Sequence, residues 1–284
     1  MVVLYSDAHL HSNPVSGLGA ERIGKKMIET GAWFACLVSL PPYHYGLGLS
    51  VDDYMRSIDM VVSEAEKLRE AGLKVRVLAG FHPAEIDEHI RHGRSPEEIL
   101  DLAEKVFKII VEKFKEGVLD GVGEVGRQHY STAPDRIVLS ELIMIRAFEI
   151  ARDHGMIVHL HLEQGGYTTV KSIERLVDFI RLREDAVFLH HVTYNEAVHA
   201  EKTNMNYTIP AKYRSLKKVF SLNLSRLLIE SDFIDDPRRP GVSSYPWDIP
   251  KRIDRLIEEG IIDEEQVNKI FIDNIVKAYQ VEPP

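Results

Sequence analysis

Histidines recur in short alternating motifs that could bind metal ions. His9 and His11 stand in Asp7-Ala8-His9-Leu10-His11, and His159 and His161 stand in Val158-His159-Leu160-His161. In extended backbone, residues two apart point to the same side, so each pair can direct two imidazoles at one ion. The His-x-His spacing alone is a weak signal, because two solvated loop histidines show it too.

Further ligand types follow other apolar runs. They are His82 in Gly80-Phe81-His82-Pro83, Glu124 in Gly123-Glu124-Val125-Gly126, the pair His190-His191, and Asp232 in Glu230-Ser231-Asp232. A glutamate inside a buried strand needs a partner, since burying a lone carboxylate is costly. An ion pair with Arg127 or Arg146 is the structural alternative for Glu124.

The placement of the histidines is more informative than their number. Of the 13 histidines, eight fall at or just beyond predicted strand ends, namely His9, His11, His82, His129, His159, His161, His190 and His191. The remaining five are expected to be solvated or locally paired: His44, His89, His92, His154 and His199. Alternation along a strand lets only one of His190 and His191 point inward.

The ligand types restrict the metal and the chemistry. Imidazole with carboxylate suits Zn²⁺, Mn²⁺, Fe²⁺, Ni²⁺ or Co²⁺, and suits Mg²⁺ less well. About six ligands exceed the four of a tetrahedral zinc site, whereas two divalent ions bridged by a carboxylate use them all. Such a pair activates water against phosphorus or carbonyl carbon, so the motifs predict a metal-dependent hydrolase.

Short apolar runs alternate with segments of helical periodicity. The predicted strands are 2–5, 34–40, 75–80, 121–125, 157–162, 187–192, 206–209 and 227–229. The predicted helices include 54–71, 99–114, 139–154 and 170–183, and Ser95-Pro96-Glu97-Glu98 is typical of a helix start. This order predicts α/β class and a single (β/α)₈ TIM barrel over residues 1–284, with a doubly wound open sheet as the alternative. The seventh strand is the weakest, because 221–224 competes with 206–209.

A barrel would gather these motifs, because the carboxyl ends of its parallel strands meet on one face, where barrel active sites lie. The sequence lacks the signatures of two other enzyme classes, the dinucleotide-binding enzymes and the serine hydrolases. Gly121 to Gly126 matches a dinucleotide fingerprint but no helix pattern follows it, and no Gly-x-Ser-x-Gly nucleophile motif occurs. The one cysteine, Cys36, lies among apolar neighbours and is expected to be buried.

Composition limits the kinds of partner that we expect this protein to bind. The chain has 284 residues, is 44% hydrophobic and carries a net charge of −9, which is typical of a folded protein and disfavours binding along an extended nucleic-acid duplex. No apolar run approaches the ~18 residues of a membrane span, and no basic leader precedes the first apolar run. We therefore expect a cytoplasmic protein without a membrane partner. The sequence is compatible with an oligomer.

Taken in order, the motifs resemble those of the TatD family of metal-dependent hydrolases, within the amidohydrolase-like barrels, and the resemblance spans almost the whole chain. It implies that His9, His11 and Asp232 hold one metal ion. It implies that His159 and His191 hold a second, with Glu124 as the bridge. Asp232 would also act on the attacking water, so Asp232 and Glu124 are the implied catalytic residues.

The resemblance also implies supporting and substrate-facing residues. Asp7 would fix the tautomer of an imidazole, and His190 would support the ligands without binding metal. His82 and His161 would face the substrate. The substrate-binding candidates also include Arg127, Arg238 and Arg239, the last two after strand eight, where barrels often bind phosphate. The implied activity is phosphodiester hydrolysis on DNA, often from an end.

The chain departs from the family pattern around the substrate. Arg127-Gln128-His129 stands where the family has Leu-Asp or a near equivalent, and His161 stands where it has arginine. These changes leave two alternatives open: a hydrolase of small lactones, amides or phosphoesters, and a barrel that binds metal or ligand without turnover. The basic residues of the loops after strands seven and eight, Lys212, Arg214, Arg238 and Arg239, favour a nucleic-acid end. Net acidity and the changed positions favour a small molecule.

Overall fold

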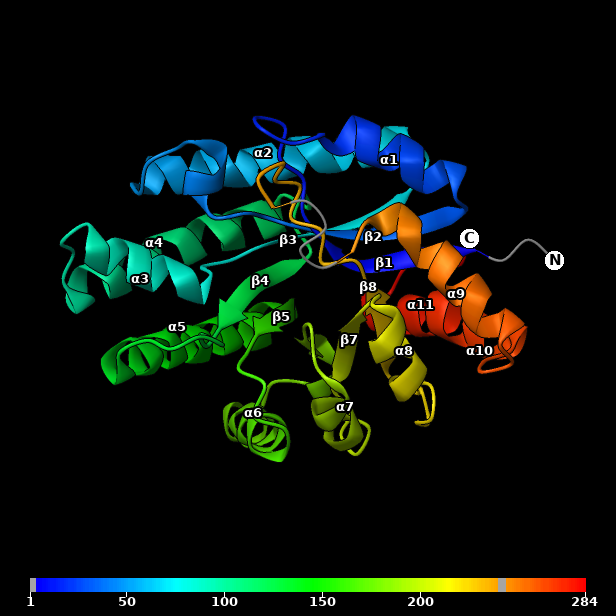
Figure 1. Ribbon diagram of the computed structural model, residues 1–284. Helices are drawn as coiled ribbons and strands as arrows, with labels where there is room; N and C mark the ends of the chain where they lie inside the picture. The colour runs from blue at the N-terminus through cyan, green and yellow to red at the C-terminus, as the bar shows by residue number, and fades with distance from the viewer. Residues whose placement is uncertain (1–3, 240–243) are drawn as a thin grey trace.

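The computed structural model describes residues 4–239 and 244–284 (Figure 1). Eight parallel strands form one sheet in the order β1 to β8, and helices alternate with them. The strands are β1 (Tyr5–Leu10), β2 (Ala32–Val38), β3 (Lys74–Ala79), β4 (Gly121–Gly126), β5 (Ile157–His161), β6 (Val187–Leu189), β7 (Asn206–Pro210) and β8 (Leu227–Glu230). The predicted (β/α)₈ barrel is confirmed, and the open sheet is excluded because a parallel bridge between Leu10 and Phe233 joins the two ends.

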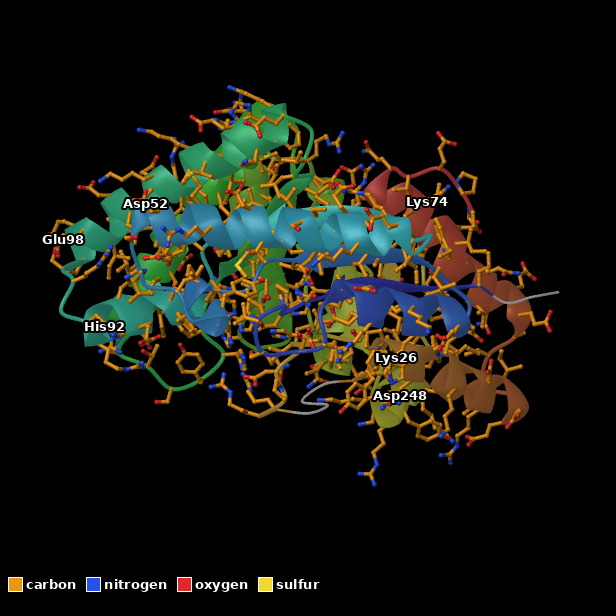
Figure 2. The ribbon with its side chains drawn as sticks, turned by 90° about the horizontal axis from the view of Figure 1, so that it is seen from above. Lys26, Asp52, Lys74, His92, Glu98 and Asp248 are labelled. Atoms are coloured by element: carbon orange, nitrogen blue, oxygen red, sulfur yellow. The ribbon has the colours of Figure 1, made fainter. Side chains whose placement is uncertain are left out.

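The helices surround the strands. They are α1 (Ala20–Glu29), α2 (Val51–Glu70), α3 (Pro83–Arg91), α4 (Pro96–Lys115), α5 (Pro134–His154), α6 (Tyr167–Ile180), α7 (Tyr194–Ala200), α8 (Tyr213–Val219), α9 (Ile249–Glu258), α10 (Glu264–Asn268) and α11 (Asn274–Tyr279). Charged residues on α1, α2 and α4 lie on the outside, as Lys26, Asp52 and Glu98 show in Figure 2. Within the described ranges, none of the helices combines the length and apolar character that a membrane span requires.

The predicted helices correspond to α2, α4, α5 and α6. The periodic segments that identified α2, α5 and α6 begin three to five residues after the start of each helix, whereas α4 begins at Pro96, as its capping motif predicts. The reason is that the first turns of these helices are largely solvent-exposed and so lack the continuous apolar stripe of the later turns. Helix α4 shows the expected start, since Ser95 Oγ accepts a hydrogen bond from the Glu98 backbone N–H at 3.2 Å.

Two strand predictions need correction. The first strand begins at Tyr5 and contains Asp7 and His9, which the sequence placed after it. The sixth strand ends at Leu189, so His190 and His191 follow it rather than continue it. His191 has a left-handed backbone with φ 45°, and alternation therefore does not separate the two rings. The seventh strand is confirmed at Asn206–Pro210.

Alternation along the strands produces two apolar clusters. One lies between the strands and the surrounding helices. The other lies inside the barrel, where strand residues such as Phe34, Cys36 and Phe188 meet Ile275 and Tyr279 of the last helix. Cys36 is fully buried there, as predicted. Helix α11 therefore contributes side chains to the inside of the barrel.

Candidate metal centre

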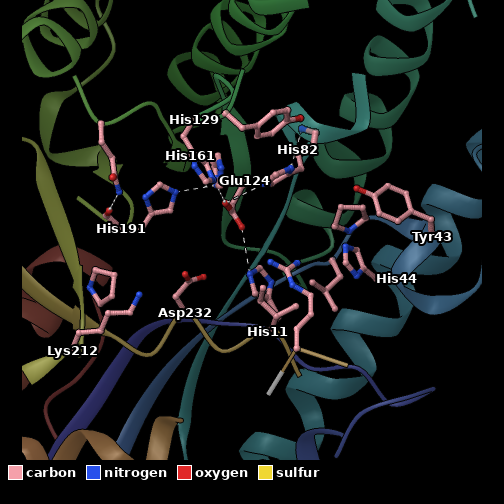
Figure 3. Close-up of a pocket in the computed structure, with 18 residues that line it drawn as sticks. His11, Tyr43, His44, His82, Glu124, His129, His161, His191, Lys212 and Asp232 are labelled. Carbon is pink, nitrogen blue, oxygen red and sulfur yellow. Dashed lines mark hydrogen bonds and ion pairs between the residues drawn. The ribbon is translucent and has the colours of Figure 1, made fainter. Parts of the chain in front are cut away.

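The carboxyl ends of the strands surround a cavity of about 490 Å³ (Figure 3). Its lining includes His11, Tyr43, His44, His82, Glu124, His129, Tyr130, His161, His191, Lys212, Asp232 and Arg239. These residues come from loops or strand ends of β1 to β8, so the fold gathers side chains that are far apart in the sequence. This is the barrel face on which the sequence motifs were expected to meet.

Glu124 lies at the centre of the histidines, and its two oxygens face different rings. Oε1 is 3.3 Å from Nε2 of His9 and 3.4 Å from Nε2 of His11. Oε2 is 2.7 Å from Nδ1 of His161 and 3.8 Å from Nε2 of His190. One carboxylate thus separates two groups of imidazole nitrogens, as a ligand that bridges two ions must.

A glycine allows β4 to approach β5 closely enough for this contact. Gly126 has φ 146°, and a Cβ at that position would lie 2.0 Å from the His161 carbonyl oxygen. Only glycine accepts both the backbone angle and the close approach. The small residues around Glu124 therefore position it against His161.

The hydrogen bonds of His11 leave its second ring nitrogen available to a metal. Nδ1 of His11 donates to the Val38 carbonyl oxygen at 2.8 Å, because a carbonyl can only accept. The neutral ring then has a lone pair on Nε2, which points at Glu124. Two groups with lone pairs attract only when a cation or proton lies between them.

His190 is held in the same way. Its Nδ1 is 2.6 Å from Oε2 of the fully buried Glu230. Its Nε2 lies 3.6 Å from Asp232 Oδ1 and faces Glu124. A carboxylate that holds the far nitrogen of an imidazole is the usual support of a metal-binding histidine. The sequence motif Glu230-Ser231-Asp232 had singled out Asp232 alone, so this role of Glu230 comes from the structure.

His82 has the opposite tautomer. Its Nδ1 accepts a hydrogen bond from the Ala84 backbone N–H at 3.1 Å, so the proton of the neutral ring is on Nε2. Nε2 lies 3.6 Å from Glu124 Oε2. His82 therefore presents an N–H donor to the cavity, which agrees with a residue that faces the substrate.

Burial and charge shape the protonation of the centre. Burial, with the charge of His190, lowers the pKa of His9 to about 3. Burial alone would raise the pKa of Glu124, but the charge of His190 and the His11 and His161 rings that face the carboxylate outweigh it and lower the pKa well below its usual value. The centre thus combines a carboxylate with a neutral imidazole.

The residues fit a metal ion. Nε2 of His9 is buried and has no hydrogen-bond partner among the described residues. A polar atom in that state is unfavourable unless something binds it. Nitrogen and oxygen atoms that could share an ion occur in the group His9, His11 and Glu124. In the second group, His82, Glu124 and His161, the available donors are Glu124 and His161, because Nε2 of His82 carries its proton. The donor set therefore suits a divalent transition metal.

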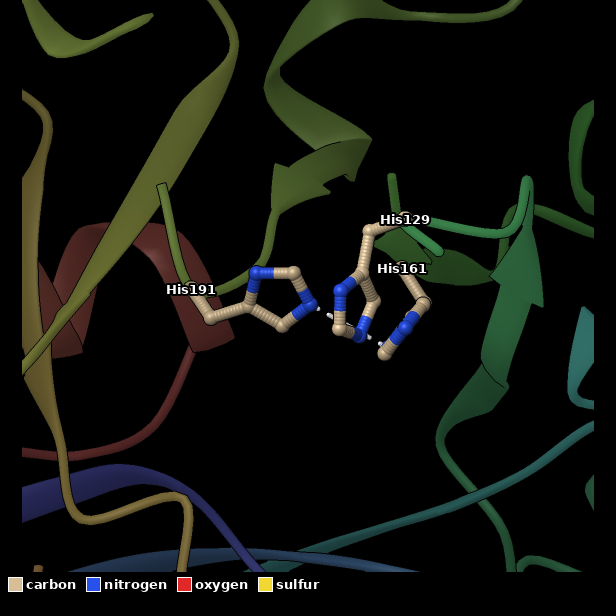
Figure 4. A group of neighbouring side chains, drawn as sticks. All are labelled: His129, His161 and His191. Atoms are coloured by element: carbon tan, nitrogen blue, oxygen red, sulfur yellow. Dashed lines mark hydrogen bonds between the residues drawn. The ribbon is translucent and has the colours of Figure 1, made fainter. Parts of the chain in front are cut away.

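A third group of histidines lies toward the cavity mouth. His129, His161 and His191 come from the loop after β4, from β5 and from the segment after β6 (Figure 4). Nε2 of His191 is 3.2 Å from Nδ1 of His161, the same nitrogen that faces Glu124. A metal ion bound by Nδ1 of His161 could therefore be shared either with Glu124 or with His191, but Nδ1 can bind only one ion at a time.

The structure separates His159 from the cavity, although the sequence had paired it with the metal ligands. His159 is fully buried, stacks on Phe188 and packs at a tilt against Tyr279, and its Nδ1 lies 3.0 Å from Nδ1 of His9. The reason is the position along β5: His161 is nearer the carboxyl end and takes the place beside Glu124.

Three further candidates lie apart from the cavity. The Arg127 guanidinium binds Glu163 through two hydrogen bonds of 2.8 and 2.9 Å, and Arg238 binds both oxygens of Asp236. Each carboxylate offsets the charge that would attract a substrate. Asp7 accepts hydrogen bonds from the backbone N–H groups of His9 and Ser231, so it joins β1 to the end of β8 instead of fixing an imidazole. Arg239 does line the cavity.

Known proteins similar in sequence or in structure identify the fold and the family of this chain. A relative from Methanocaldococcus jannaschii, described as an uncharacterized protein, is 29% identical over 280 residues and spans 98% of this chain and 96% of its own length. The TatD homolog YjjV of Escherichia coli superposes with a TM-score of 0.70 at 16% identity, covering 99% of this chain and all of that one.

A variant of a lactonase from Deinococcus radiodurans superposes with a TM-score of 0.65 at 12% identity, over 98% of this chain and 96% of that one. Identities this low show a common fold and no more. The family model described as TatD related DNase matches residues 6–280. That match covers nearly all of the sequence and includes every histidine and carboxylate of the centre, so the chain belongs to the TatD-related DNase family.

Proposed function

We propose that this protein is a hydrolase that uses two divalent metal ions to hydrolyse phosphodiesters at a nucleic-acid end. The observation that carries the proposal is the position of Glu124, whose two oxygens face separate groups of imidazole nitrogens. His9, His11 and Asp232 are the proposed ligands of one ion. His161 and His190 are those of the other, and Glu124 is the bridge.

This ligand set revises the sequence hypothesis at two positions. His161 replaces His159, because Nδ1 of His161 lies 2.7 Å from Glu124, whereas the two ring nitrogens of His159 lie beside His9 and Tyr279. His190 replaces His191, because Glu230 holds Nδ1 of His190 and leaves Nε2 directed at the carboxylates. His191 then forms part of the cavity wall.

The protein groups divide the remaining tasks of hydrolysis. Two bound ions would supply a water of lowered pKa and offset negative charge on the substrate. Asp232 lines the cavity and can accept the proton of the attacking water. The Nε2–H of His82, which lies 3.3 Å from Nδ1 of His161 and 3.6 Å from Oε2 of Glu124, can donate to a substrate oxygen in the cavity.

The cavity walls support an anionic substrate of limited size. Lys212 and Arg239 extend from the loops after β7 and β8, and Tyr43 and Tyr130 offer rings on which a base can stack. A volume of about 490 Å³ admits the end of a strand rather than a length of duplex. The net charge of −9 also disfavours binding along a duplex.

A small-molecule hydrolase is the second candidate. The observation that favours it is the pairing of Arg127 with Glu163, which offsets the charge of an arginine near the site. Lactones and phosphotriesters lack the charge that Lys212 and Arg239 would bind, so they would use the metal centre without these residues.

The deciding experiment is a substrate panel assayed with Mn²⁺ or Zn²⁺: single-stranded DNA, bis(nitrophenyl) phosphate and lactones. We expect turnover of the first two, and loss of about 100-fold or more in kcat for Asp232→Asn with an unchanged circular dichroism spectrum. Turnover of lactones alone would replace the nuclease proposal with the second candidate. A metal-replete protein that contains no transition metal would refute both.

A further inference from the structure

A chain of three polar groups runs from the last helix to the metal centre. The Tyr279 hydroxyl of α11 donates to the Ala8 carbonyl oxygen at 2.7 Å and lies 3.2 Å from Nε2 of His159. Nδ1 of His159 then lies 3.0 Å from Nδ1 of His9. His9, His159 and Tyr279 are all buried, so water does not compete for these contacts.

The number of protons available to these three side chains determines which atom donates in each hydrogen bond. A carbonyl oxygen only accepts, so the single hydroxyl proton of Tyr279 goes to Ala8. The Tyr279 oxygen must then accept from His159, which places the proton of the neutral His159 ring on Nε2. Nδ1 of His159 has the lone pair and accepts from Nδ1–H of His9.

His9 is consequently left with a lone pair on Nε2, the atom that faces Glu124 Oε1 at 3.3 Å. The opposite tautomer would put a proton on Nε2, and His9 would donate a hydrogen bond to Glu124 instead of binding a cation. The difference between a histidine–glutamate hydrogen bond and a metal ligand thus depends on which way the proton of His9 is held.

We propose that Tyr279 and His159 are positioning residues that hold His9 in its metal-binding tautomer, so that the C-terminal helix controls one ligand of the metal centre. This inference rests on the proposed two-metal hydrolase. It gives a role to a buried histidine that the catalytic groups do not use. It also links β1, β5 and α11 through one hydrogen-bonded path.

Two substitutions of His159 separate positioning from packing. The His159→Gln side chain has one amide N–H₂ to donate and one oxygen to accept, so it can replace both hydrogen bonds. The His159→Leu side chain fills similar space and can do neither. Tyr279→Phe keeps the ring and removes the hydroxyl, which accepts from His159 and donates to the Ala8 carbonyl.

The measurement is titration of the metal-free protein with Co²⁺, followed by absorption of the bound ion, together with thermal unfolding of the same metal-free samples. In His159→Leu and Tyr279→Phe we expect affinity for one of the two ions to fall by about 10–100-fold, while affinity for the other ion is retained. His159→Gln should restore most of the affinity. Tyr54→Phe is the matched control, because its hydroxyl contacts His89, away from His9.

The outcomes distinguish this inference from the proposed function. A wild-type protein that binds no Co²⁺ would refute the two-metal site itself. Wild-type binding of two ions with unchanged affinities in His159→Leu and Tyr279→Phe would refute only the positioning role. Equal losses of affinity in His159→Gln and His159→Leu, in step with their unfolding temperatures, would show that His159 acts by packing, and would overturn the inference.

Discussion

Nε2 of His11 lies 3.4 Å from Oε1 of Glu124, although the His11 proton is committed to the Val38 carbonyl on the other side of the ring. Two acceptors at that distance need a cation or a proton between them. Burial would lower the pKa of His11, but Glu124 and Asp232 outweigh it and raise the pKa. The pair is arranged to hold positive charge, which is what a metal ligand and a bridging carboxylate require.

Glu124→Gln tests that arrangement. The amide keeps the size of the side chain but lacks the negative charge between the two histidine groups, so metal content should fall from two equivalents to one or none. At a free metal concentration 100 times Kd, each lost ion removes about 2.7 kcal/mol of stabilisation. Elemental analysis and thermal unfolding with and without a chelator measure the two effects. Glu163→Gln, which alters the Arg127 pair outside the cavity, should keep both ions.

Substitutions of the two neighbouring histidines after β6 should have different effects on metal binding. Because Glu230 holds Nδ1 of His190, His190→Gln and Glu230→Gln should each weaken one ion by about 10-fold or more. His191→Gln should leave metal affinity within about threefold of the wild type, since His191 contacts His161 rather than a carboxylate. Metal titration of the three variants decides whether His190 or His191 is the ligand. A larger loss of metal affinity in His191→Gln than in His190→Gln would assign the role to His191.

Lys212 and Arg239 should determine the preference for charged substrates. The double variant Lys212→Gln, Arg239→Gln is expected to raise KM for bis(nitrophenyl) phosphate by about 10-fold, with little change for an uncharged ester, because only the anion loses its attraction. Arg238→Gln is the control, since Asp236 binds that guanidinium. Equal changes for charged and uncharged substrates would exclude an anion-binding role.

Stability at acidic pH should depend on His89, which is buried beside Tyr54 and Phe81 and is not one of the proposed ligands. Burial, with the charges of Arg94 and His92, lowers the pKa of His89 from 6.5 to about 4. The unfolded chain therefore binds a proton that the folded one rejects, and His89 destabilises the fold as pH falls from about 6.5 to about 4.

His89→Gln removes this titration and keeps a partner for the Tyr54 hydroxyl. Denaturant unfolding at several pH values should show a smaller loss of stability in the variant than in the wild type across that window. Above about pH 7 the two proteins should show the same dependence on pH. A wild type and variant with parallel profiles throughout would show that His89 titrates normally.

Much of the architecture was predictable from local pattern. The alternation of apolar runs and amphipathic segments predicted the (β/α)₈ barrel, and the motifs at the strand ends predicted one histidine-rich face. Errors arose where local pattern carries no signal. The first turns of α2, α5 and α6 are largely solvent-exposed, and the short sixth strand ends before His190 because the backbone turns there.

The residue types at the end of each strand can be read from the chain alone, and they were enough to predict that nitrogen and oxygen ligands meet on one face of a barrel. Which of these ligands face one another depends on how the chain packs in three dimensions. His159 and His161 have the same spacing signal, yet only the second reaches Glu124. Long-range packing sets how far along its strand each histidine lies. It also sets the hydrogen bonds that the histidine rings make with Val38, Glu230 and Tyr279, and no local sequence pattern records either.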